Sequence, residues 1–186
     1  MSNVEELFVR SGAVLKGHFL LTSGLHSPVY WEKFQVLQFP RYTGQLCGLM
    51  AGHFRDKGIE VVAGPTTGGV VLAFETARQL DVRAIFAEKA EGGGRVFRRG
   101  FSVRPGERVL VVDDILTTGG SVREVVEAVT RLGGQLAGVA VLVDRAEHHI
   151  DFGVPLFACH RSETVTYRPE ACPLCAAGLP LTRPGG

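Results

Sequence analysis

The sequence lacks the long apolar run that a membrane-spanning helix needs, since no apolar stretch approaches the roughly 20 residues required. Its first residues, MSNVEELFVRSGAV, also lack the basic flank and apolar core of a secretion signal. The 186 residues include four cysteines, too few for a disulfide framework in a chain of this size. We therefore expect a cytoplasmic protein in a reducing compartment, with no membrane partner.

The sequence also lacks an excess of charge of either sign. Lys and Arg together number 20 and Asp and Glu 19, which gives a formal net charge of +1. A nucleic-acid partner would favour a basic balance, so we expect a small-molecule ligand instead. With 45% hydrophobic and 21% charged residues, the composition is typical of a globular chain, and its length fits one domain.

Strand-like and helix-like segments alternate along the middle of the chain. ERVLVVDD is a continuous apolar run that predicts a buried strand ending at Asp113. SVREVVEAVTRLGG has apolar residues at helical spacing, with Ser121 as the expected N-cap and Gly133 as the expected stop. LAGVAVLVDR predicts the next strand, and EVVAGPTTGG, GVVLAFETARQL and VRAIFAEK repeat this order earlier. Two such units predict an α/β fold with a central, mainly parallel sheet flanked by helices.

The two ends of the chain fit neither unit. Within residues 36–160, the expected α/β core, PRYTGQLCGLMAGHFRDKG predicts a helix that begins at Pro40 and closes at Gly58. We expect residues 1–35 to form a small cap and residues 161–186 a C-terminal extension of the same single domain.

Polar residues follow the predicted strands where the strands stop. In a parallel sheet these ends share one edge, where ligands bind. The residues expected to converge there are Thr66, Thr67, Glu88, Lys89, Asp113, Asp114 and Arg145.

The segment TTGGS leads from a predicted strand into a predicted helix. Such a turn presents backbone N–H groups and the positive end of the helix to an anion. Its hydroxyl groups add further donors, so we expect it to bind a phosphate monoester. Its residues are Thr117, Thr118, Gly119, Gly120 and Ser121.

Two adjacent carboxylates, Asp113 and Asp114, stand shortly before this turn. A sugar attached to the phosphate would present vicinal hydroxyl groups, for which carboxylates are strong acceptors. The same pair would stabilise a sugar that becomes cationic during reaction. The alternative, that the aspartates merely cap the next turn, leaves the agreement among the neighbouring polar residues unexplained.

Two common nucleotide-binding motifs are absent. A Walker loop ends in Gly-Lys-Ser/Thr, whereas GPTTGGVV has Val70 where the lysine would stand. No G-x-G-x-x-G follows a predicted strand either. A nucleotide held by its triphosphate, or a dinucleotide, is therefore not the expected ligand.

VLVVDDILTTGGS (109–121) resembles the phosphoribosyl-diphosphate-binding signature of the type I phosphoribosyltransferases. HFLLTSGLHSPVYW (18–31), GPTTGG (64–69) and VLVDR (141–145) resemble the hood, diphosphate loop and orotate-contacting strand end of the orotate-using branch of that family. The resemblance covers roughly residues 5–157, in the family's order. It implies the family's fold with a small N-terminal hood, and transfer of the phosphoribosyl group of 5-phosphoribosyl 1-diphosphate to orotate. The products would be orotidine 5′-monophosphate and diphosphate, in pyrimidine biosynthesis.

The resemblance also implies roles for individual residues. Asp113 and Asp114 would hold the ribose hydroxyls and stabilise an oxocarbenium-like transition state, and residues 117–121 would hold the 5′-phosphate. Arg145 would pair with orotate, because a guanidinium matches a carboxylate or imide edge with two parallel hydrogen bonds. The alternative for Arg145 is a surface ion pair with a neighbouring acidic residue.

Further parts of the implied site lie elsewhere in the chain. Thr66, Thr67 and Gly68 would contact the diphosphate, and they could form a helix N-cap at the same time. Tyr30 and Trp31 stand at hood positions that line the base, where plain packing is the alternative. Mg²⁺ would bind mainly through the substrate diphosphate and water, and the protein would be a homodimer.

Residues 89–100 are expected to form a mobile loop that reaches the neighbouring subunit's site. The family commonly places a Lys and a His there, but this segment has no His. The basic candidates here are Lys89, which aligns best with a catalytic diphosphate-binding lysine, and Arg95, Arg98 and Arg99. The sequence departs from the family twice more: Gly68 replaces a lysine of the diphosphate loop, and Thr22 stands where the hood sometimes has a basic residue.

The motif CPLC at 172–175 has the residue types of half a zinc site. The other half would have to come from Cys159 and His160, which are neighbours in the chain and poorly placed to share a metal. We therefore expect free thiols.

The sequence predicts an orotate-using phosphoribosyltransferase with no nucleic-acid partner. A purine-using enzyme would share the acid pair and the turn but not the hood motif SGLHSPVYW. A non-catalytic regulator that senses phosphoribosyl diphosphate would need a basic surface, which the net charge does not favour. Catalytic turnover would separate the enzyme from the sensor.

Overall fold

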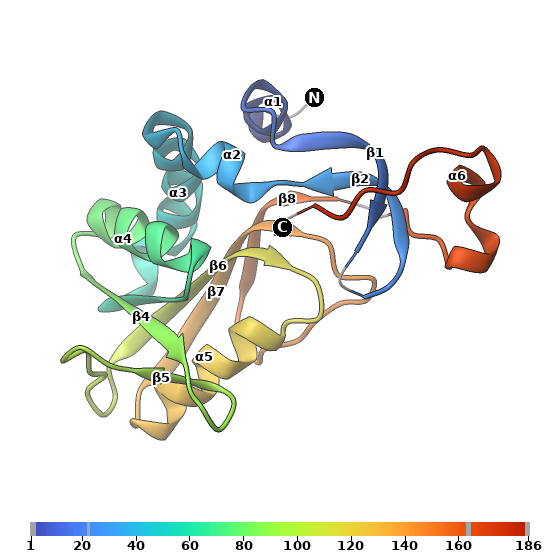
Figure 1. The fold of residues 1–186 in the computed structure, drawn as a ribbon. Helices are drawn as coiled ribbons and strands as arrows, with labels where there is room; N and C mark the ends of the chain where they lie inside the picture. Colours follow the sequence, from blue (N-terminus) through green and yellow to red (C-terminus); the bar gives the residue numbers. More distant parts are fainter. Residues whose placement is uncertain (1–2, 22, 163–164, 185–186) are drawn as a thin grey trace. The chain divides into compact units, whose positions relative to one another are not determined.

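Helices and strands alternate through most of the chain in the computed structural model, which describes residues 3–21, 23–162 and 165–184 (Figure 1). In chain order the elements are α1 (Asn3–Arg10), β1 (Val14–Leu20), β2 (His26–Trp31), α2 (Lys33–Leu37), α3 (Pro40–Phe54), η1 (Arg55–Lys57), β3 (Val61–Pro65), α4 (Gly68–Leu80), β4 (Arg83–Lys89), β5 (Arg95–Phe97), β6 (Arg108–Leu116), α5 (Gly120–Arg131), β7 (Gln135–Asp144), β8 (Leu156–Arg161), η2 (Pro169–Ala171) and α6 (Pro173–Ala176). These elements form two compact units, residues 37–162 and residues 1–36 with 163–186. Among the described helices, none is long and apolar enough to cross a membrane.

A six-stranded sheet organises the larger unit. Its strand order is β5-β4-β3-β6-β7-β8, and all neighbours run parallel except β4 and β5, which are antiparallel. The two predicted units, β3-α4-β4 and β6-α5-β7, are both present, which confirms the mainly parallel α/β sheet. Strands β5 and β8 were not predicted and extend the sheet at its two edges.

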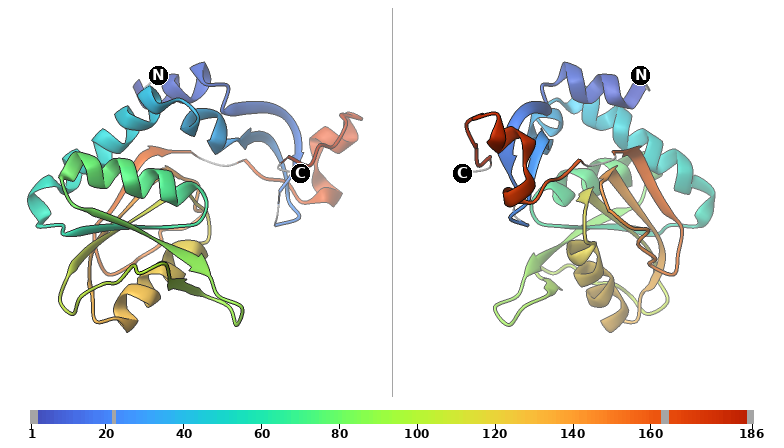
Figure 2. Two further views of the ribbon diagram at one scale, coloured as in Figure 1. Left: turned by 60° about the vertical axis from the view of Figure 1, so that its left-hand side comes forward. Right: turned by 90° about the vertical axis from the view of Figure 1, so that its right-hand side faces the viewer.

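Helices cover both faces of this sheet (Figures 1 and 2). On one face, α5 buries Val122, Val125 and Val129 against valines and alanines of β3, β6 and β7. On the other, α4 packs on β3, β4 and β6, and α3 lies beside α4 and over β7 and β8. Leu46 of α3 and Leu72 of α4 are fully buried there. The apolar strand runs are therefore covered on both faces, as their composition predicts.

The boundaries of three elements bear on the site. The α3 helix begins at Pro40 as predicted but ends at Phe54, and the short turn η1 continues to Gly58, which closes the segment in a left-handed conformation. The strand predicted to end at Asp113 continues to Leu116, so the acid pair lies inside β6. The residue at the N-cap of α5 is Gly119 rather than Ser121, which lies within the first turn.

The smaller unit joins the two ends of the chain. Strands β1 and β2 form an antiparallel pair, and the C-terminal segment 165–184 is bonded to both. Tyr167 exchanges two backbone hydrogen bonds of 2.8 Å with His26, and Thr182 accepts from Leu20 N at 2.9 Å and donates to His18 O at 2.8 Å. The predicted hood and C-terminal extension, which are far apart in the sequence, thus belong to one unit.

Candidate active site

The candidate active site lies where the direction of chain winding changes in the sheet. β3 and β6 are neighbours, but β3 leads through α4 to β4 on one side, and β6 leads through α5 to β7 on the other. Their pairing ends at Ala63 and Val111, whereas β6 stays paired with β7 as far as Leu116. The carboxyl ends of β3 and β6 therefore separate at the position where open α/β sheets bind ligands.

The acid pair occupies this end of β6. Asp113 and Asp114 are each 5% exposed. Asp113 Oδ1 accepts from Asp114 N at 2.8 Å, and Asp114 Oδ1 accepts from Ile115 N at 2.7 Å. Backbone amides thus help to fix both carboxylates, so their orientation is set by the strand itself.

The turn after β3 lies against the acid pair. Thr66 N donates to Ala87 O of β4 at 3.1 Å, and the peptide between Thr66 and Thr67 is cis. Thr67 stands at the N-cap of α4 but makes no side-chain cap hydrogen bond. Next to it, a Cβ on Gly68 would overlap Asp114 Oδ2, so the backbone of this turn touches the carboxylate. The structure therefore joins the predicted diphosphate loop to the predicted ribose-binding acids.

The second turn, after β6, has the geometry of an anion site. Gly119 has φ 79°, and a Cβ there would lie 3.3 Å from side-chain atoms of Ile150 and Phe152. The left-handed backbone and the close packing both favour glycine at this position. Thr117, Thr118, Gly120 and Ser121 are exposed, and the N-cap residue of α5 is Gly119, which has no side chain to accept a hydrogen bond. The first N–H groups of α5 thus lack the usual acceptor from an N-cap side chain and can serve an anion.

Arg145 follows β7 and is half-buried. Its backbone N donates to Leu116 O at 2.8 Å, which fixes it beside the turn that holds Thr117. Asp144, one of the two acids considered as its ion-pair partner, lies 3.2 Å from Arg161 Nε and accepts from Ala146 N at 3.0 Å. Asp144 is thus already bonded to Arg161 and to the backbone of Ala146.

Residues 89–100, predicted to be a mobile loop, include the strand β5 and form a hairpin with β4. Lys89 and Arg98 are exposed, as binding residues in a loop would be. Arg99 is paired with Glu88 at 2.8 Å. The prediction of a mobile loop is therefore wrong for residues 95–97, which form a strand paired with β4.

Arg95 is buried, unlike the other basic residues of this hairpin. Its Nη1 donates to Thr66 Oγ1 and to Ala87 O, both at 3.1 Å. Its Nε lies 3.2 Å from Glu124 Oε2 of α5, in an ion pair without hydrogen-bond alignment. Arg95 thus connects the turn after β3 to the helix after β6. The sequence pattern gave no sign of this brace, because its partners are 29 residues away on either side, at Thr66 and Glu124.

The predicted hood residues belong to the smaller unit. Trp31 is buried, and its ring meets Phe8 edge-on at a centroid distance of 5.0 Å. This contact supports the packing alternative for Trp31. Tyr30 is half-buried, with its ring 5.8 Å from that of Phe19. Thr22 lies outside the described residues.

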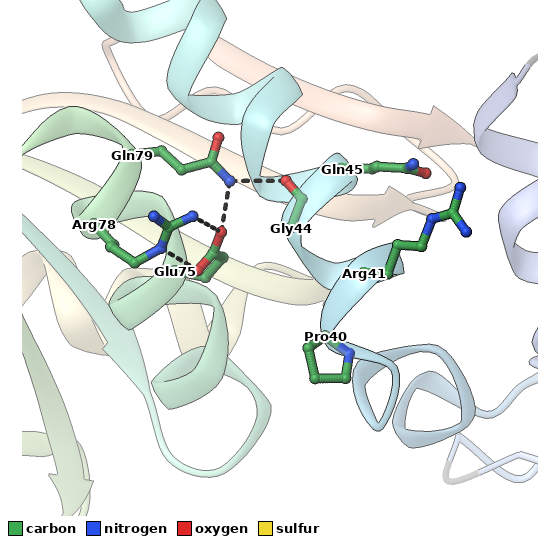
Figure 3. A pocket seen from close by; sticks show the side chains of 7 residues that line it. All are labelled: Pro40, Arg41, Gly44, Gln45, Glu75, Arg78 and Gln79. Atoms are coloured by element: carbon green, nitrogen blue, oxygen red, sulfur yellow. Dashed lines mark hydrogen bonds and ion pairs between the residues drawn. The ribbon is translucent and has the colours of Figure 1, made fainter.

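A separate hollow of about 660 Å³ lies between α3 and α4 (Figure 3). Glu75 is one of its lining residues and accepts hydrogen bonds from Arg78 at 2.9 Å and from Gln79 Nε2 at 2.7 Å. The hydrogen bonds from Arg78, and then that from Gln79, hold the pKa of Glu75 below its ordinary value despite partial burial. This carboxylate is therefore committed to the helix surface, away from the turns that start α4 and α5.

Two of the four cysteines can be set aside as reactive groups. Burial raises the pKa of both Cys47 and Cys159 to about 12, so both remain protonated thiols. Cys159 donates to Leu46 O at 3.5 Å. It belongs to the larger unit, whereas Cys172 and Cys175 belong to the smaller one. The structure therefore does not support the zinc site that we considered, formed by CPLC with Cys159 and His160.

Comparison with known proteins identifies the family. Residues 35–151 match the phosphoribosyl transferase domain family. Orotate phosphoribosyltransferase from Pelotomaculum thermopropionicum is 52% identical over 96% of this chain and 94% of its own, and that from Chlorobaculum parvum is 50% identical over 100% and 96%. The crystal structure of orotate phosphoribosyltransferase from Aeropyrum pernix is similar with a TM-score of 0.72 and 28% identity, over 85% of this chain and 93% of that one. The chain belongs to the orotate phosphoribosyltransferase family of type I phosphoribosyltransferases.

Proposed function

We propose that this chain transfers the phosphoribosyl group of 5-phosphoribosyl 1-diphosphate to orotate. The observation that carries the proposal is the meeting of Gly68 with Asp114, which joins a diphosphate-type turn to a ribose-type acid pair. Relatives of about half-identical sequence are named for the orotate reaction, which favours orotate over a purine as the acceptor. An adenine phosphoribosyltransferase is also similar in structure, but at 18% identity it indicates the fold alone.

Asp113 and Asp114 are proposed to accept the ribose hydroxyls and to stabilise the sugar as it becomes cationic. A preoriented carboxylate stabilises developing positive charge strongly in a site that excludes water. Both carboxylates are nearly buried and accept backbone N–H bonds, so little reorganisation is needed when charge develops. Breaking the bond from ribose to diphosphate ahead of attack by the pyrimidine nitrogen would use this pair most fully.

The two turns are proposed to divide the phosphates between them. The turn 117–121 and the first N–H groups of α5 would hold the 5′-phosphate, since the N-cap residue Gly119 has no side chain to accept from them. Thr66, Thr67 and Gly68 would hold the diphosphate, with Arg95 fixing the Thr66 hydroxyl. Lys89 and Arg98, both exposed, would add positive charge to the departing diphosphate.

The described residues also fit Mg²⁺ brought by the substrate. No three carboxylates gather within them as a dedicated Mg²⁺ cage would require. Mg²⁺ is typically bound by one or two carboxylates together with substrate phosphates and water, and the acid pair beside the diphosphate turn offers that set. When bound, the ion would neutralise charge on the diphosphate leaving group.

Arg145 is proposed to select the base. Its backbone bond to Leu116 O places it at the rim of the same sheet edge. The planar guanidinium suits the carboxylate or imide edge of orotate. Tyr30 of the smaller unit remains a proposed contact to the base.

We also propose that two copies pair through α3 and α4. Leu49, Val71 and Phe74 are large apolar side chains on these adjacent helices, and Phe74 is 64% exposed. Covering such side chains with a second copy would remove apolar area from water. A homodimer also allows the hairpin 89–100 to serve a neighbouring site. A reducing, cytoplasmic location fits the four cysteines, none of which is in a disulfide.

The decisive experiment follows the ultraviolet absorbance of orotate mixed with the purified chain, Mg²⁺ and phosphoribosyl diphosphate. Hypoxanthine, guanine, adenine and uracil are tested in parallel. Consumption of orotate that requires both Mg²⁺ and the donor is the expected result. Reaction of a purine instead would refute orotate as acceptor, and binding of phosphoribosyl diphosphate without turnover would favour a sensor.

A further inference from the structure

Four metal-ligating side chains meet in the smaller unit, outside the candidate active site. They are His18 on β1, His26 on β2, and Cys172 and Cys175 at the start of α6. One ligand atom from each lies within 4.8 Å of all the others. The group draws on three separate parts of the fold, so its convergence is a property of the tertiary structure.

The spacing of the donor atoms suits a tetrahedral ion. Zinc bonds of about 2.3 Å to sulfur and 2.0–2.1 Å to nitrogen place the ligand atoms of a tetrahedron roughly 3.3–3.8 Å apart. Cys172 Sγ lies 3.6 Å and Cys175 Sγ 3.7 Å from His18 Nε2, and Cys175 Sγ lies 3.3 Å from His26 Nδ1. The two ring nitrogens are closer, at 2.9 Å, and would separate slightly around an ion.

The tautomer of His18 is fixed in the form that a metal requires. Its Nδ1 lies 2.8 Å from Leu179 O, and a carbonyl oxygen can only accept. Nδ1 therefore carries a proton, so Nε2 is the nitrogen through which the ring can coordinate a metal, and it faces His26 and the two sulfurs. Metal-bound histidines commonly make this second hydrogen bond to a carbonyl or carboxylate.

A hydrogen-bonded cluster without metal explains the arrangement less well. The single lone pair of His18 Nε2 faces three neighbours, the ring nitrogen of His26 and both sulfurs, but can accept one well-aligned hydrogen bond. Both histidines and Cys172 are 4% exposed, so water cannot readily satisfy the remaining polar atoms. One cation satisfies all four donors at once.

We propose that His18, His26, Cys172 and Cys175 bind one structural zinc ion. Two thiolates and two imidazoles are the ligand set that zinc prefers, and four protein ligands leave no open position for catalysis. The reaction's Mg²⁺ prefers oxygen ligands, so the two ions would not compete for this site. This proposal replaces our expectation that both cysteines are free thiols.

The ion would fasten the C-terminal segment to the β1–β2 hairpin. Among described residues 165–184, Cys172 is the one buried side chain, so hydrophobic burial does little to hold this segment. The backbone bonds from Tyr167 to His26 and from Thr182 to His18 lie at the two histidine ligands themselves. A segment with so little core is the kind that a metal stabilises.

The test measures zinc in the intact chain purified without chelators, by elemental mass spectrometry. We expect one zinc ion per chain. Cys175→Ser should lose nearly all of it, and because Cys175 is exposed the change removes no core side chain. Cys159→Ser is the matched control, which removes a cysteine outside the cluster and should keep the full zinc content. Equal zinc in both variants would overturn the proposal, because the ion would then lie elsewhere.

A second measurement does not depend on variants. Intact chain freed of metal by a chelator is titrated with Co²⁺ and then with Zn²⁺. Tetrahedral coordination with two thiolates predicts strong visible d–d bands and a near-ultraviolet sulfur-to-cobalt band, both abolished by Zn²⁺. Failure to bind either ion, or a spectrum without thiolate ligation, would refute the site. Orotate turnover of the same samples reports separately on the proposed function.

Discussion

Replacing Gly68 with alanine tests whether the diphosphate turn and the acid pair act as one site. A Cβ at Gly68 would overlap Asp114 Oδ2. To relieve this overlap, the carboxylate must turn away and give up its 2.7 Å bond from Ile115 N. A hydrogen bond to a charged group contributes roughly 1.5–3 kcal/mol. Alanine in place of glycine in a helix stabilises the folded state by up to about 1 kcal/mol, so the net loss in the free energy of unfolding should be small.

The effect on catalysis should be larger than the effect on stability. The lost hydrogen bond also leaves the Asp114 carboxylate misaligned with the sugar. If the transition state loses the same free energy as this bond, kcat/KM falls by roughly tenfold to a hundredfold. The assay is steady-state orotate consumption at saturating Mg²⁺, with thermal unfolding measured alongside. Gly52→Ala on α3 is the control, because a Cβ there meets no atom within 4 Å. A Gly68→Ala enzyme with wild-type kcat/KM would refute the coupling of turn and acid pair.

Four further changes test other parts of the proposal. Asp114→Asn should lower kcat by about 10²–10³ with little change in Tm, as removal of a transition-state-stabilising group does; unchanged kcat would contradict that role. Arg145→Ala should raise KM for orotate far more than KM for phosphoribosyl diphosphate, and equal increases would exclude a selective contact. Phe74→Glu should shift the mass measured by light scattering from dimer to monomer; a persistent dimer would place the interface elsewhere. Desolvation raises the pKa of Glu107, but hydrogen bonds from Arg104 N and Arg83 outweigh it and leave the pKa below its ordinary 4.5. The ionised Glu107 therefore contributes fully to the free energy of unfolding above pH 4.5, and this contribution disappears as pH falls through the lowered pKa. Glu107→Gln should make the free energy of unfolding depend less on pH in this acid range, as measured by denaturant unfolding at a series of pH values.

The parts of the fold that could be predicted are those with a strong local pattern. Helices α4 and α5 show apolar spacing of the helical period, and β3, β6 and β7 are continuous apolar runs of strand length. Such patterns depend on neighbours within one element, so the sequence displays them directly. Strand β5 has three residues, and its order comes from pairing with β4, which no local pattern reports.

The N-cap of α5 shows a local rule overridden by the site. Serine is a preferred N-cap, which led us to Ser121. In the structure Gly119, which has no side chain to accept a hydrogen bond, takes that place in a left-handed conformation. A side-chain cap would occupy the N–H groups that an anion needs, so the departure from the rule is what a phosphate site requires.

The histidine–cysteine cluster could not be predicted from spacing, although its residues were visible. His18 and His26 lie on the paired strands β1 and β2, within the segment that resembles a hood. Their partners Cys172 and Cys175 follow more than 140 residues later. The only partners we weighed for CPLC were Cys159 and His160, which are nearer in the chain but poorly placed and in the other unit, so we expected free thiols.

The placement of the groups on rigid or turn elements predicts how each will respond to change. Asp113 and Asp114 lie within a strand that stays bonded to β7 beyond its last bond to β3, so their position is fixed while the neighbouring edge stays open. Lys89 ends β4 at the glycine-rich turn of the hairpin, and Arg98 follows the short strand β5, so both lie at the margins of the sheet. Groups held by strands keep their geometry more accurately than groups on turns. Substitutions in the acid pair should therefore act mainly on kcat, whereas those at the hairpin should act through binding of the donor.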